Sequence, residues 1–388
     1  MGPWAVFIVL VLGAFLLVVS LVRWGHTVAR ASALEDRGTE LILVPLPTAG
    51  HSIALHRYRP AVRRFETPII VCHGMAVNRF SMDAHEDGQG SDRLSLARAL
   101  VRAGFDVFTL ELRGRGNAEV PARSNWSVDD EVREDVPAAI ARVLLETGQP
   151  ELLWVGHSKG SILQLMLHAR QHPSAQQVKG IVAIGSPSTL RFQRSKLRLL
   201  VPLAYVVLFF FGRLPFRGSG PLLSPLAPVL HHAGGRFETL LGMNRPTSLR
   251  PIFASIFEDV SGGVLRQMLT WVKHKDGALL GIDGFVFEDH YDRIKVPLLL
   301  IAGSRDLLAP PAAVEWVRSR AGSQDIEFVL ASRATGFSAD YGHGDLVLGE
   351  RAPEEIFPRI VAWLEAHAVP LSAPAAQPEE IAPISNST

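Results

Sequence analysis

Short apolar runs alternate with helical patterns over most of the chain. Residues 67–74 and 151–156 predict buried strands, because each is a brief apolar run that ends in glycine. Residues 91–105 and 127–148 predict helices, because leucine, alanine or valine recurs at intervals of three and four positions. Strands that alternate with helices of this length favour a parallel sheet with helices on both faces.

Turn and cap residues mark where several of these elements begin and end. Ser91 is expected to cap the first of the two helices, and Gly104 to end it. Nearer the start of the chain, residues 40–47 and 51–60 are expected to form an antiparallel strand pair, since a Pro-Thr-Ala-Gly turn lies between them. The expected sheet is therefore mostly, but not entirely, parallel.

The alternation stops between about residues 190 and 289 and then resumes. The interrupted stretch is rich in proline and glycine, and its longest apolar run, "LVPLAYVVLFFFGRLPF", is too short and too proline-rich to span a bilayer. The composition beyond residue 367 is typical of a disordered tail. We therefore predict a core in two parts, residues 39–189 and 290–367, with an inserted cap over residues 190–289 and a tail over residues 368–388.

The N-terminal residues 3–22 contain no charged side chain. As a helix with a rise of about 1.5 Å per residue they would span about 30 Å of hydrocarbon. A cleaved signal peptide is the alternative, but the only positive charge ahead of the run is the terminal amine, and the nearest small-residue site, residues 31–33, lies well beyond Val22. We therefore expect an uncleaved single-pass transmembrane anchor in contact with membrane lipid.

Charge gives further limits on location and partners. Arg23, Arg30 and Arg37 follow the apolar run and no basic side chain precedes it, so the positive-inside rule favours a cytoplasmic position for the rest of the chain. The formal net charge of +1 gives no electrostatic reason to expect nucleic acid as a partner. The single cysteine, Cys72, excludes an internal disulfide.

Two glycines flank a lone serine between a predicted strand and a predicted helix. Gly156, Ser158 and Gly160 form a G-x-S-x-G pattern after "LLWV" and before "SILQLML". This placement is typical of a nucleophile elbow, in which a strained turn lifts the serine hydroxyl clear of the sheet and leaves no room for neighbouring side chains. An ordinary glycine-rich turn is the alternative interpretation.

A serine nucleophile acting near neutral pH needs a histidine base and a carboxylate that orients the base. Asp306 follows the predicted strand "PLLLIAG", and His343 lies in a glycine-flanked loop before the last helix. The chain order Ser158, Asp306, His343 is the order expected after a nucleophile elbow. Weaker candidates for the acid, which precede that strand, are Asp283, Asp289 and Asp292.

Two backbone amides are candidates for stabilising a developing oxyanion. One belongs to Lys159, directly after the serine, and the other to Met75, where Gly74 lets the loop turn inward. His73 is expected to fix this loop, and Cys72 is expected to be buried packing and not a second nucleophile. No histidines have zinc-site spacing with a third ligand, so neither a metal site nor a cofactor is predicted.

Together these motifs resemble the α/β-hydrolase superfamily over about residues 39–367. The resemblance rests on His73-Gly74-Met75, "RAGFDVFTLELRGRG", Gly156 to Gly160, "LLLIAGSRDLLAPP" and "YGHGDLVLG". It implies the α/β-hydrolase fold, with a mostly parallel central sheet, helices on both faces and a cap inserted after the sixth strand.

Two further segments are similar to the acid-lipase-like and polyester-synthase-like branches, whose members act on acyl esters or thioesters. They are "NWSVDDEVREDVPAAI" and "GHGDLVLGERAPEEIFPRIVAWL". The synthase-like enzymes use cysteine as the nucleophile, so Ser158 favours hydrolysis here. Lys159 stands where many acid lipases have glutamine.

The sequence therefore predicts a membrane-anchored serine hydrolase of carboxylic esters with hydrophobic or lipid-like acyl groups. Ser158 is expected to attack the ester carbonyl, His343 to take and return the proton, and Asp306 to orient His343. An acyltransferase with the same triad and a non-catalytic binding module are the alternatives. The apolar run of the cap is expected to line an acyl pocket, to form an outward interfacial patch, or to build the cap's own core.

Overall fold

The computed structural model describes most of the chain. The two ends and part of the segment expected to form the cap are not described. The described residues are 34–37, 40–85, 91–121, 124–217 and 254–371, with Ser20, residues 23–25 and Thr27. The expected anchor over residues 3–22, except Ser20, and most of the expected tail over residues 368–388 lie outside them. Among the helices of the described residues, none is long and apolar enough to cross a bilayer.

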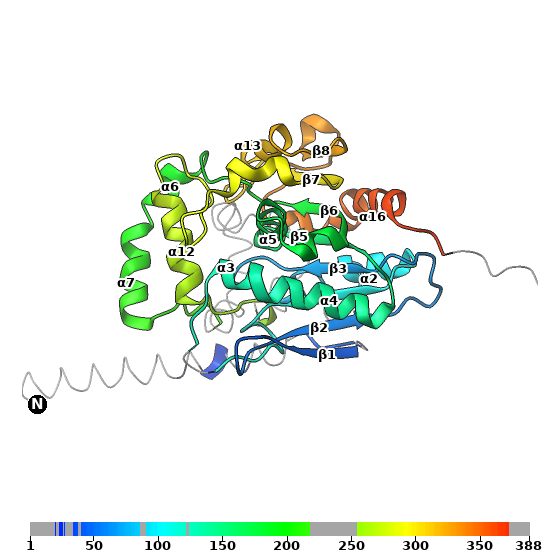
Figure 1. Ribbon diagram of the computed structural model, residues 1–388, viewed down its shortest axis with the longest axis horizontal. Coiled ribbons are helices and arrows are strands. Elements are labelled where there is room, and N and C mark those ends of the chain that lie inside the picture. Colours follow the sequence, from blue (N-terminus) through cyan, green and yellow to red (C-terminus); the bar gives the residue numbers. More distant parts are fainter. Residues whose placement is uncertain are drawn as a thin grey trace, which may run out of the picture.

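A single eight-stranded sheet runs through the molecule in the order β1-β2-β4-β3-β5-β6-β7-β8 (Figure 1). The pairs β1–β2 and β2–β4 are antiparallel and all other pairs are parallel. The mostly parallel sheet and its antiparallel start are therefore confirmed. The strands are β1 (Glu40–Pro45), β2 (Ser52–Tyr58), β3 (Ile69–Cys72), β4 (Val107–Glu111), β5 (Leu152–His157), β6 (Val178–Ile184), β7 (Leu298–Gly303) and β8 (Ile326–Ala331).

Helices cover both faces of this sheet, as predicted. Neighbouring residues of one strand lie in different buried clusters, Ile70 in one and Ile69 in the other, because successive side chains of a strand point to opposite faces. One cluster contains side chains from α4, α5 and α13, and the other contains side chains from α2 and α16. The bounds of these helices are α2 (Leu96–Arg102), α4 (Val136–Thr147), α5 (Lys159–Ala169), α13 (Pro311–Glu315) and α16 (Phe357–His367).

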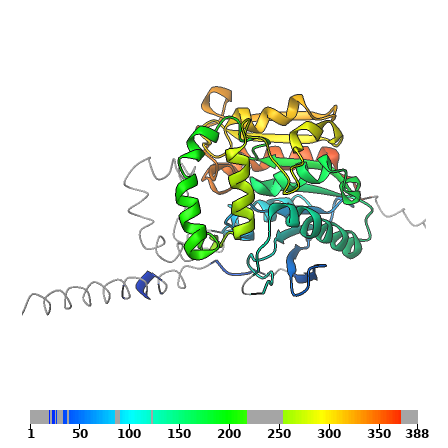
Figure 2. The same ribbon diagram turned by 60° about the vertical axis from the view of Figure 1, so that its left-hand side comes forward.

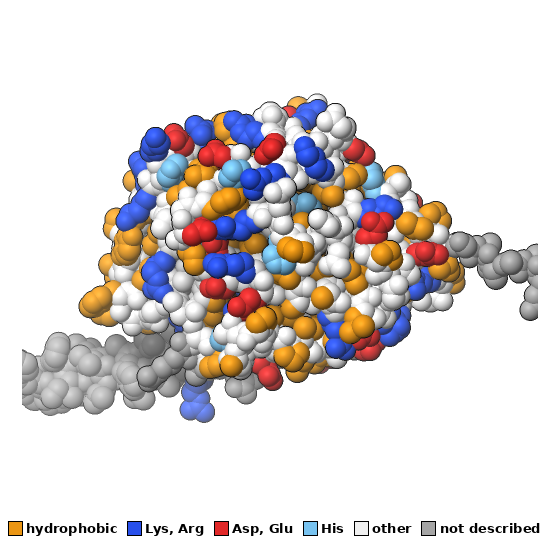
Figure 3. All heavy atoms as spheres, in the orientation of Figure 1, with side chains coloured by type: hydrophobic (Ala, Val, Ile, Leu, Met, Phe, Trp, Pro, Cys, Tyr) orange, Lys and Arg blue, Asp and Glu red, His pale blue; other side chains and the backbone are white. Residues whose placement is uncertain are grey.

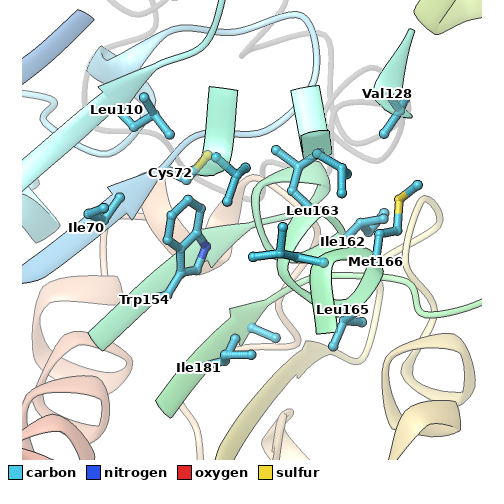
Figure 4. Packing of buried hydrophobic residues seen from close by; sticks show 14 of the residues in the cluster. Ile70, Cys72, Leu110, Val128, Trp154, Ile162, Leu163, Leu165, Met166 and Ile181 are labelled. Atoms are coloured by element: carbon cyan, nitrogen blue, oxygen red, sulfur yellow. The ribbon is translucent and has the colours of Figure 1, made fainter. Parts of the chain in front are cut away.

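Helix α5 is buried along its whole length, which explains why most of its residues are apolar. It packs on the sheet around Trp154, with Leu163 and Met166 among its inward side chains (Figure 4). The indole N–H of Trp154 donates a hydrogen bond to the carbonyl oxygen of Gly160 at 3.0 Å. The strand and the helix that flank Ser158 are thus fixed to one another.

The helix predicted from Ser91 begins later than expected. Ser95, not Ser91, is the N-cap of α2, and its hydroxyl accepts a hydrogen bond from the Arg98 N–H at 3.0 Å. The helix cannot start earlier because Ser95 is extended and forms a β-bridge with Asp83. Gly104 follows the helix with φ +97°, as expected for a residue that ends it.

The helix predicted over residues 127–148 forms, but with a break in its hydrogen-bonding pattern. Ser127 caps the short α3 (Val128–Asp130), a π-helical turn follows at Glu131–Asp135, and α4 ends at Gly148 with φ +68°. A π-helical turn is unusual inside an α-helix and often marks a functional site. Here it places Glu131 against the start of α5.

The segment that is expected to form the cap lies between β6 and β7. Its described part contains α6 (Arg194–Arg198), α7 (Val201–Phe211) and α12 (Gly262–Lys273). Figure 2 shows α12 next to the body of the molecule and α7 outside it. After the cap, the short helices α14 (Asp345–Leu348) and α15 (Ala352–Glu355) precede α16.

Candidate active site

Ser158 occupies a sharp turn between β5 and α5. Its backbone has φ 52° and ψ −121°, a conformation that residues with a side chain rarely adopt and that costs about 1–3 kcal/mol. Its N–H donates to the carbonyl oxygen of Ile184 at 2.8 Å, which ties the turn to β6. Its side chain is half-buried, so the hydroxyl is not sealed in the core.

Glycine is required at both flanking positions of the elbow, because neighbouring backbone atoms leave no room for a Cβ atom. A Cβ atom at Gly156 would lie 2.5 Å from the backbone nitrogen of Ser161, and one at Gly160 would lie 2.4 Å from the carbonyl oxygen of Cys72. Neither backbone atom can move aside without breaking the sheet or the helix. The strand, the turn and the helix can therefore pack this closely only with glycine at both positions.

Asp306 and His343 meet at the carboxyl end of the sheet. His343 Nδ1 lies 2.7 Å from Asp306 Oδ2. The other carboxylate oxygen of Asp306 accepts the N–H groups of Leu308 at 2.9 Å and Ala309 at 2.7 Å. Asp306 is 2% exposed. Burial raises the pKa of its carboxyl. The positive charge and hydrogen bond of His343 and the two N–H donors lower that pKa by more, so it lies below the ordinary value.

The same region brings His343 to the serine turn. His157 precedes Ser158, and its Nε2–H donates to the carbonyl oxygen of His343 at 3.1 Å. The centroids of the two imidazole rings lie 4.7 Å apart. Ile184 accepts the Ser158 N–H, and Gly185 follows it. A Cβ atom at Gly185 would lie 3.3 Å from His343 Nδ1, so His343 lies close to the end of the strand that holds the serine turn. The described residues contain no hydrogen bond between Ser158 Oγ and His343, a contact that often tightens only when substrate binds.

The loop after β3 also approaches the serine. A Cβ at Gly74 would lie 3.3 Å from the Cβ of Ser158. His73 fixes this loop through a hydrogen bond from Nδ1–H to the Gly74 carbonyl oxygen at 2.8 Å. Met75 follows, half-buried. Lys159 opens α5, and the N–H groups of a first helical turn have no partner within the helix.

Burial sets the protonation of the other reactive groups near Ser158. It lowers the pKa of both His73 and His157 to about 3, so both imidazoles are neutral at pH 7. It raises the pKa of the Cys72 thiol, which therefore stays protonated. These residues are suited to packing and hydrogen bonding and not to proton transfer.

The weaker acid candidates lie elsewhere. Asp283 pairs with Arg170 at 2.7 Å, and Asp289 and Asp292 are exposed in the segment before β7. None of the three has a hydrogen bond to His343. Among the described residues, no group of histidine, cysteine and acidic side chains could hold a metal ion.

One buried ion pair beside the elbow was not predicted. Lys159 Nζ lies 2.6 Å from Glu131 Oε1, and the two side chains are 3% and 0% exposed. The sequence analysis considered only the backbone N–H of Lys159. A lysine directly after the serine of a buried turn could have indicated an acidic residue nearby, because a buried ammonium group requires a partner of opposite charge.

Comparison with known proteins agrees with this fold. The family model for the alpha/beta hydrolase fold matches residues 67–333. Human lipase member K is 24% identical over 304 residues, which cover 70% of this chain and 74% of that protein. Bovine gastric triacylglycerol lipase is 23% identical over 307 residues, with coverage of 70% and 74%.

A solved structure of a thermophilic esterase from Thermogutta terrifontis has the same fold. It superposes with a TM-score of 0.54 at 17% identity, and the match covers 85% of this chain and 100% of that one.

Proposed function

The chain belongs to the alpha/beta hydrolase fold family, and on that premise we propose that it is a carboxylic ester hydrolase that uses Ser158, His343 and Asp306. The observation that carries the proposal is the buried 2.7 Å contact between His343 and Asp306, next to a serine held at φ 52°. The lipases that the sequence resembles support an ester as the substrate, and their names favour hydrophobic acyl groups.

In the proposed reaction Ser158 Oγ attacks the carbonyl carbon of the ester while His343 Nε2 takes its proton. Asp306 accepts the hydrogen bond from His343 Nδ1–H and stabilises the imidazolium. The C–O bond to the alcohol then breaks, and the alcohol leaves with that proton. A water molecule, deprotonated by His343, attacks the acyl-enzyme and releases the acid and free Ser158.

The negative charge on the carbonyl oxygen is proposed to be stabilised by the N–H groups of Met75 and Lys159. Two observations support this assignment. Gly74, which precedes Met75, closely approaches Ser158, and Lys159 is the first residue of α5. The positive end of the helix dipole adds to the same effect.

An activity-based probe tests the proposal directly. A fluorophosphonate should label the full-length protein once, and peptide mass spectrometry should place the label on Ser158. Labelling should be lost in Ser158→Ala, and a panel of p-nitrophenyl esters should then be hydrolysed only by the unsubstituted protein. Absence of labelling and of hydrolysis with a folded protein would reject the assignment, and transfer of the acyl group to an added alcohol in preference to water would indicate an acyltransferase.

We also propose that residues 3–22 anchor the protein in a membrane, with the catalytic body on the cytoplasmic side. The support is the uncharged apolar sequence and the arginines that follow it. The full chain should sediment with membranes and resist carbonate extraction. Recovery of soluble protein that begins at Leu34 would instead indicate a cleaved signal peptide.

A further inference from the structure

Helix α7 presents an apolar surface that the described part of the molecule does not cover. No side chain of α7 is buried. Phe209 is 84% exposed and Phe210 is 71% exposed. Six exposed apolar side chains, one of them just before the helix, are here named the α7 surface. They are Leu199, Leu203, Val206, Phe209, Phe210 and Phe211. Hydrophobic side chains gather over the same edge of the molecule in Figure 3.

This exposure is unusual for a helix of this composition. Residues 199–212 contain no charged side chain, and a helix that is apolar on all sides is normally buried. A contiguous exposed apolar patch on a soluble domain indicates an interaction site. The described cap helix α12 contacts α7 but leaves these side chains in solvent.

The charges around the α7 surface indicate what the partner is. Residues 191–217 contain six basic residues and no acidic residue, whereas the whole chain has a net charge of only +1. The basic side chains lie at both ends of the apolar stretch. Lys196 and Arg198 precede it, Arg213 and Arg217 follow it, and all four are exposed, with Arg213 paired to Asp259 and Arg217 to Glu258. An apolar centre with basic ends is the pattern of a helix that lies in the interface of an anionic bilayer.

The position of α7 agrees with a membrane partner. Figures 1 and 2 place the short helical piece at residues 23–25 on the same side of the molecule as α7. Trp24 in that piece is 54% exposed, and tryptophan is enriched at membrane interfaces. Both segments can therefore face the same bilayer.

We propose that α7 lies in the surface of an anionic lipid bilayer, with the α7 surface among the acyl chains and the flanking basic side chains on lipid phosphates. This contact does not depend on the hydrolase chemistry. It would hold the cap at the membrane, and the cap is joined to the loop after β3 by a bridge between Phe257 and Val77 and by the hydrogen bond from Glu258 N–H to the Ala76 carbonyl oxygen at 2.8 Å. The active site would then lie close to lipid-borne substrate.

A spin label tests the proposal in the full-length protein. The only native cysteine, Cys72, is buried, so the substitution Phe209→Cys provides the only accessible thiol. Leu145→Cys on α4, where the native side chain is 76% exposed, is the matched control. The protein is reconstituted in vesicles of phosphatidylcholine and phosphatidylglycerol in equal parts. Collision of each label with oxygen, which partitions into lipid, and with a water-soluble nickel complex is then measured.

We expect the label at position 209 to collide more often with oxygen and several-fold less often with the nickel complex than the label at position 145. Equal access of the nickel complex to both labels would overturn the proposal. Spin–spin broadening at position 209 would show that a second copy covers α7, and shielding from both reagents would show that protein covers it. Fluorophosphonate labelling of the same samples reports the proposed hydrolase function separately.

Discussion

Ser158 is held in a conformation that its own side chain disfavours, and the neighbouring residues make that conformation obligatory. Gly156 and Gly160 allow backbone contacts that no other residue would permit, and the hydrogen bond to Ile184 fixes the turn to β6. Strain of this kind persists only where the surroundings outweigh it, and it is common at catalytic residues. The hydroxyl itself contributes little to packing.

We therefore expect Ser158→Ala to abolish ester hydrolysis without lowering the thermal unfolding temperature. His343→Ala should reduce kcat to within about tenfold of the same level, because the members of a triad act as a unit. Both are measured by p-nitrophenyl ester hydrolysis and by thermal unfolding. Full activity in either variant, with the probe now on Ser161, would contradict the assignment, although Ser161 is fully buried and donates to the Gly156 carbonyl oxygen at 2.7 Å.

The carboxylate of Asp306 has a separate test. Asp306→Asn should lower kcat by a factor of about 10³ or more, because the amide cannot orient and stabilise the imidazolium of His343 as a carboxylate does. Steady-state kinetics at saturating ester provides the measurement. Asp289→Asn, an exposed site before β7, is the control and should be close to the unsubstituted protein. The reverse result would place the acid at Asp289.

At the scale of elements, the π-helical turn and α5 are joined by the buried pair of Glu131 and Lys159. The pair fixes the first residue of α5, whose N–H is proposed to bind the oxyanion. Because both side chains are removed from water, loss of one leaves the other as an uncompensated buried group. The contact thus has a structural effect that is independent of catalysis.

Glu131→Gln is expected to lower the free energy of unfolding by about 3–5 kcal/mol, because it leaves a buried ammonium without a counter-ion. Urea unfolding in detergent measures this change. The double variant Glu131→Leu with Lys159→Met should recover most of the loss. Glu315→Gln, which removes the exposed pair with Arg318, is the control and should cost less than about 1 kcal/mol. Equal effects at both sites would contradict the argument.

Helix α7 is expected to affect how hydrolysis depends on acyl-chain length. We predict that kcat/KM rises from acetyl to octanoyl esters, with up to about 0.8 kcal/mol gained for each buried methylene. Phe209→Asp or Phe210→Asp should flatten this rise for esters presented in vesicles and leave hydrolysis of a soluble acetate ester unchanged. Leu145→Asp on α4 is the control. A preference for acetate over every longer ester would contradict this prediction.

At the scale of the whole molecule, the two buried clusters enclose ionisable groups that must stay neutral. His73 and His157 both have a pKa lowered to about 3 by burial. In the unfolded chain their pKa returns to about 6.5. Between these values the unfolded state binds more protons than the folded state, so stability rises with pH and falls as the pH is lowered.

These two histidines should therefore lower the stability between about pH 7.5 and about pH 5, by about 2 kcal/mol each. Urea unfolding of the full chain at the two pH values measures the loss. His157→Gln should remove about 2 kcal/mol of this loss. His51→Gln, in the turn between β1 and β2, is the control and should leave the loss unchanged. An unaltered pH dependence in His157→Gln would show that this histidine is not the source.

The sequence alone determined the features that depend on local geometry and chain order. The G-x-S-x-G pattern identified the elbow because only glycine fits beside Ser158, and periodicity identified most strands and helices. The positions of Asp306 and His343 followed from where strands end, because parallel strands bring their carboxyl ends to one edge of the sheet. The anchor over residues 3–22 is still a prediction from sequence, since the described residues include only Ser20 of it.

Only the tertiary structure decided which distant residues meet and which surfaces are exposed. The start of α2 at Ser95 depends on a bridge to Asp83, and the partner of Lys159 is 28 positions away, so no local pattern encodes either contact. The apolar run of the expected cap was compatible with an acyl pocket, an outward patch and a core of its own. The exposure of α7 favours the outward patch, because its side chains lack neighbours that would bury them. Hydrophobic pattern specifies that a segment needs an apolar environment, whereas packing decides what supplies it.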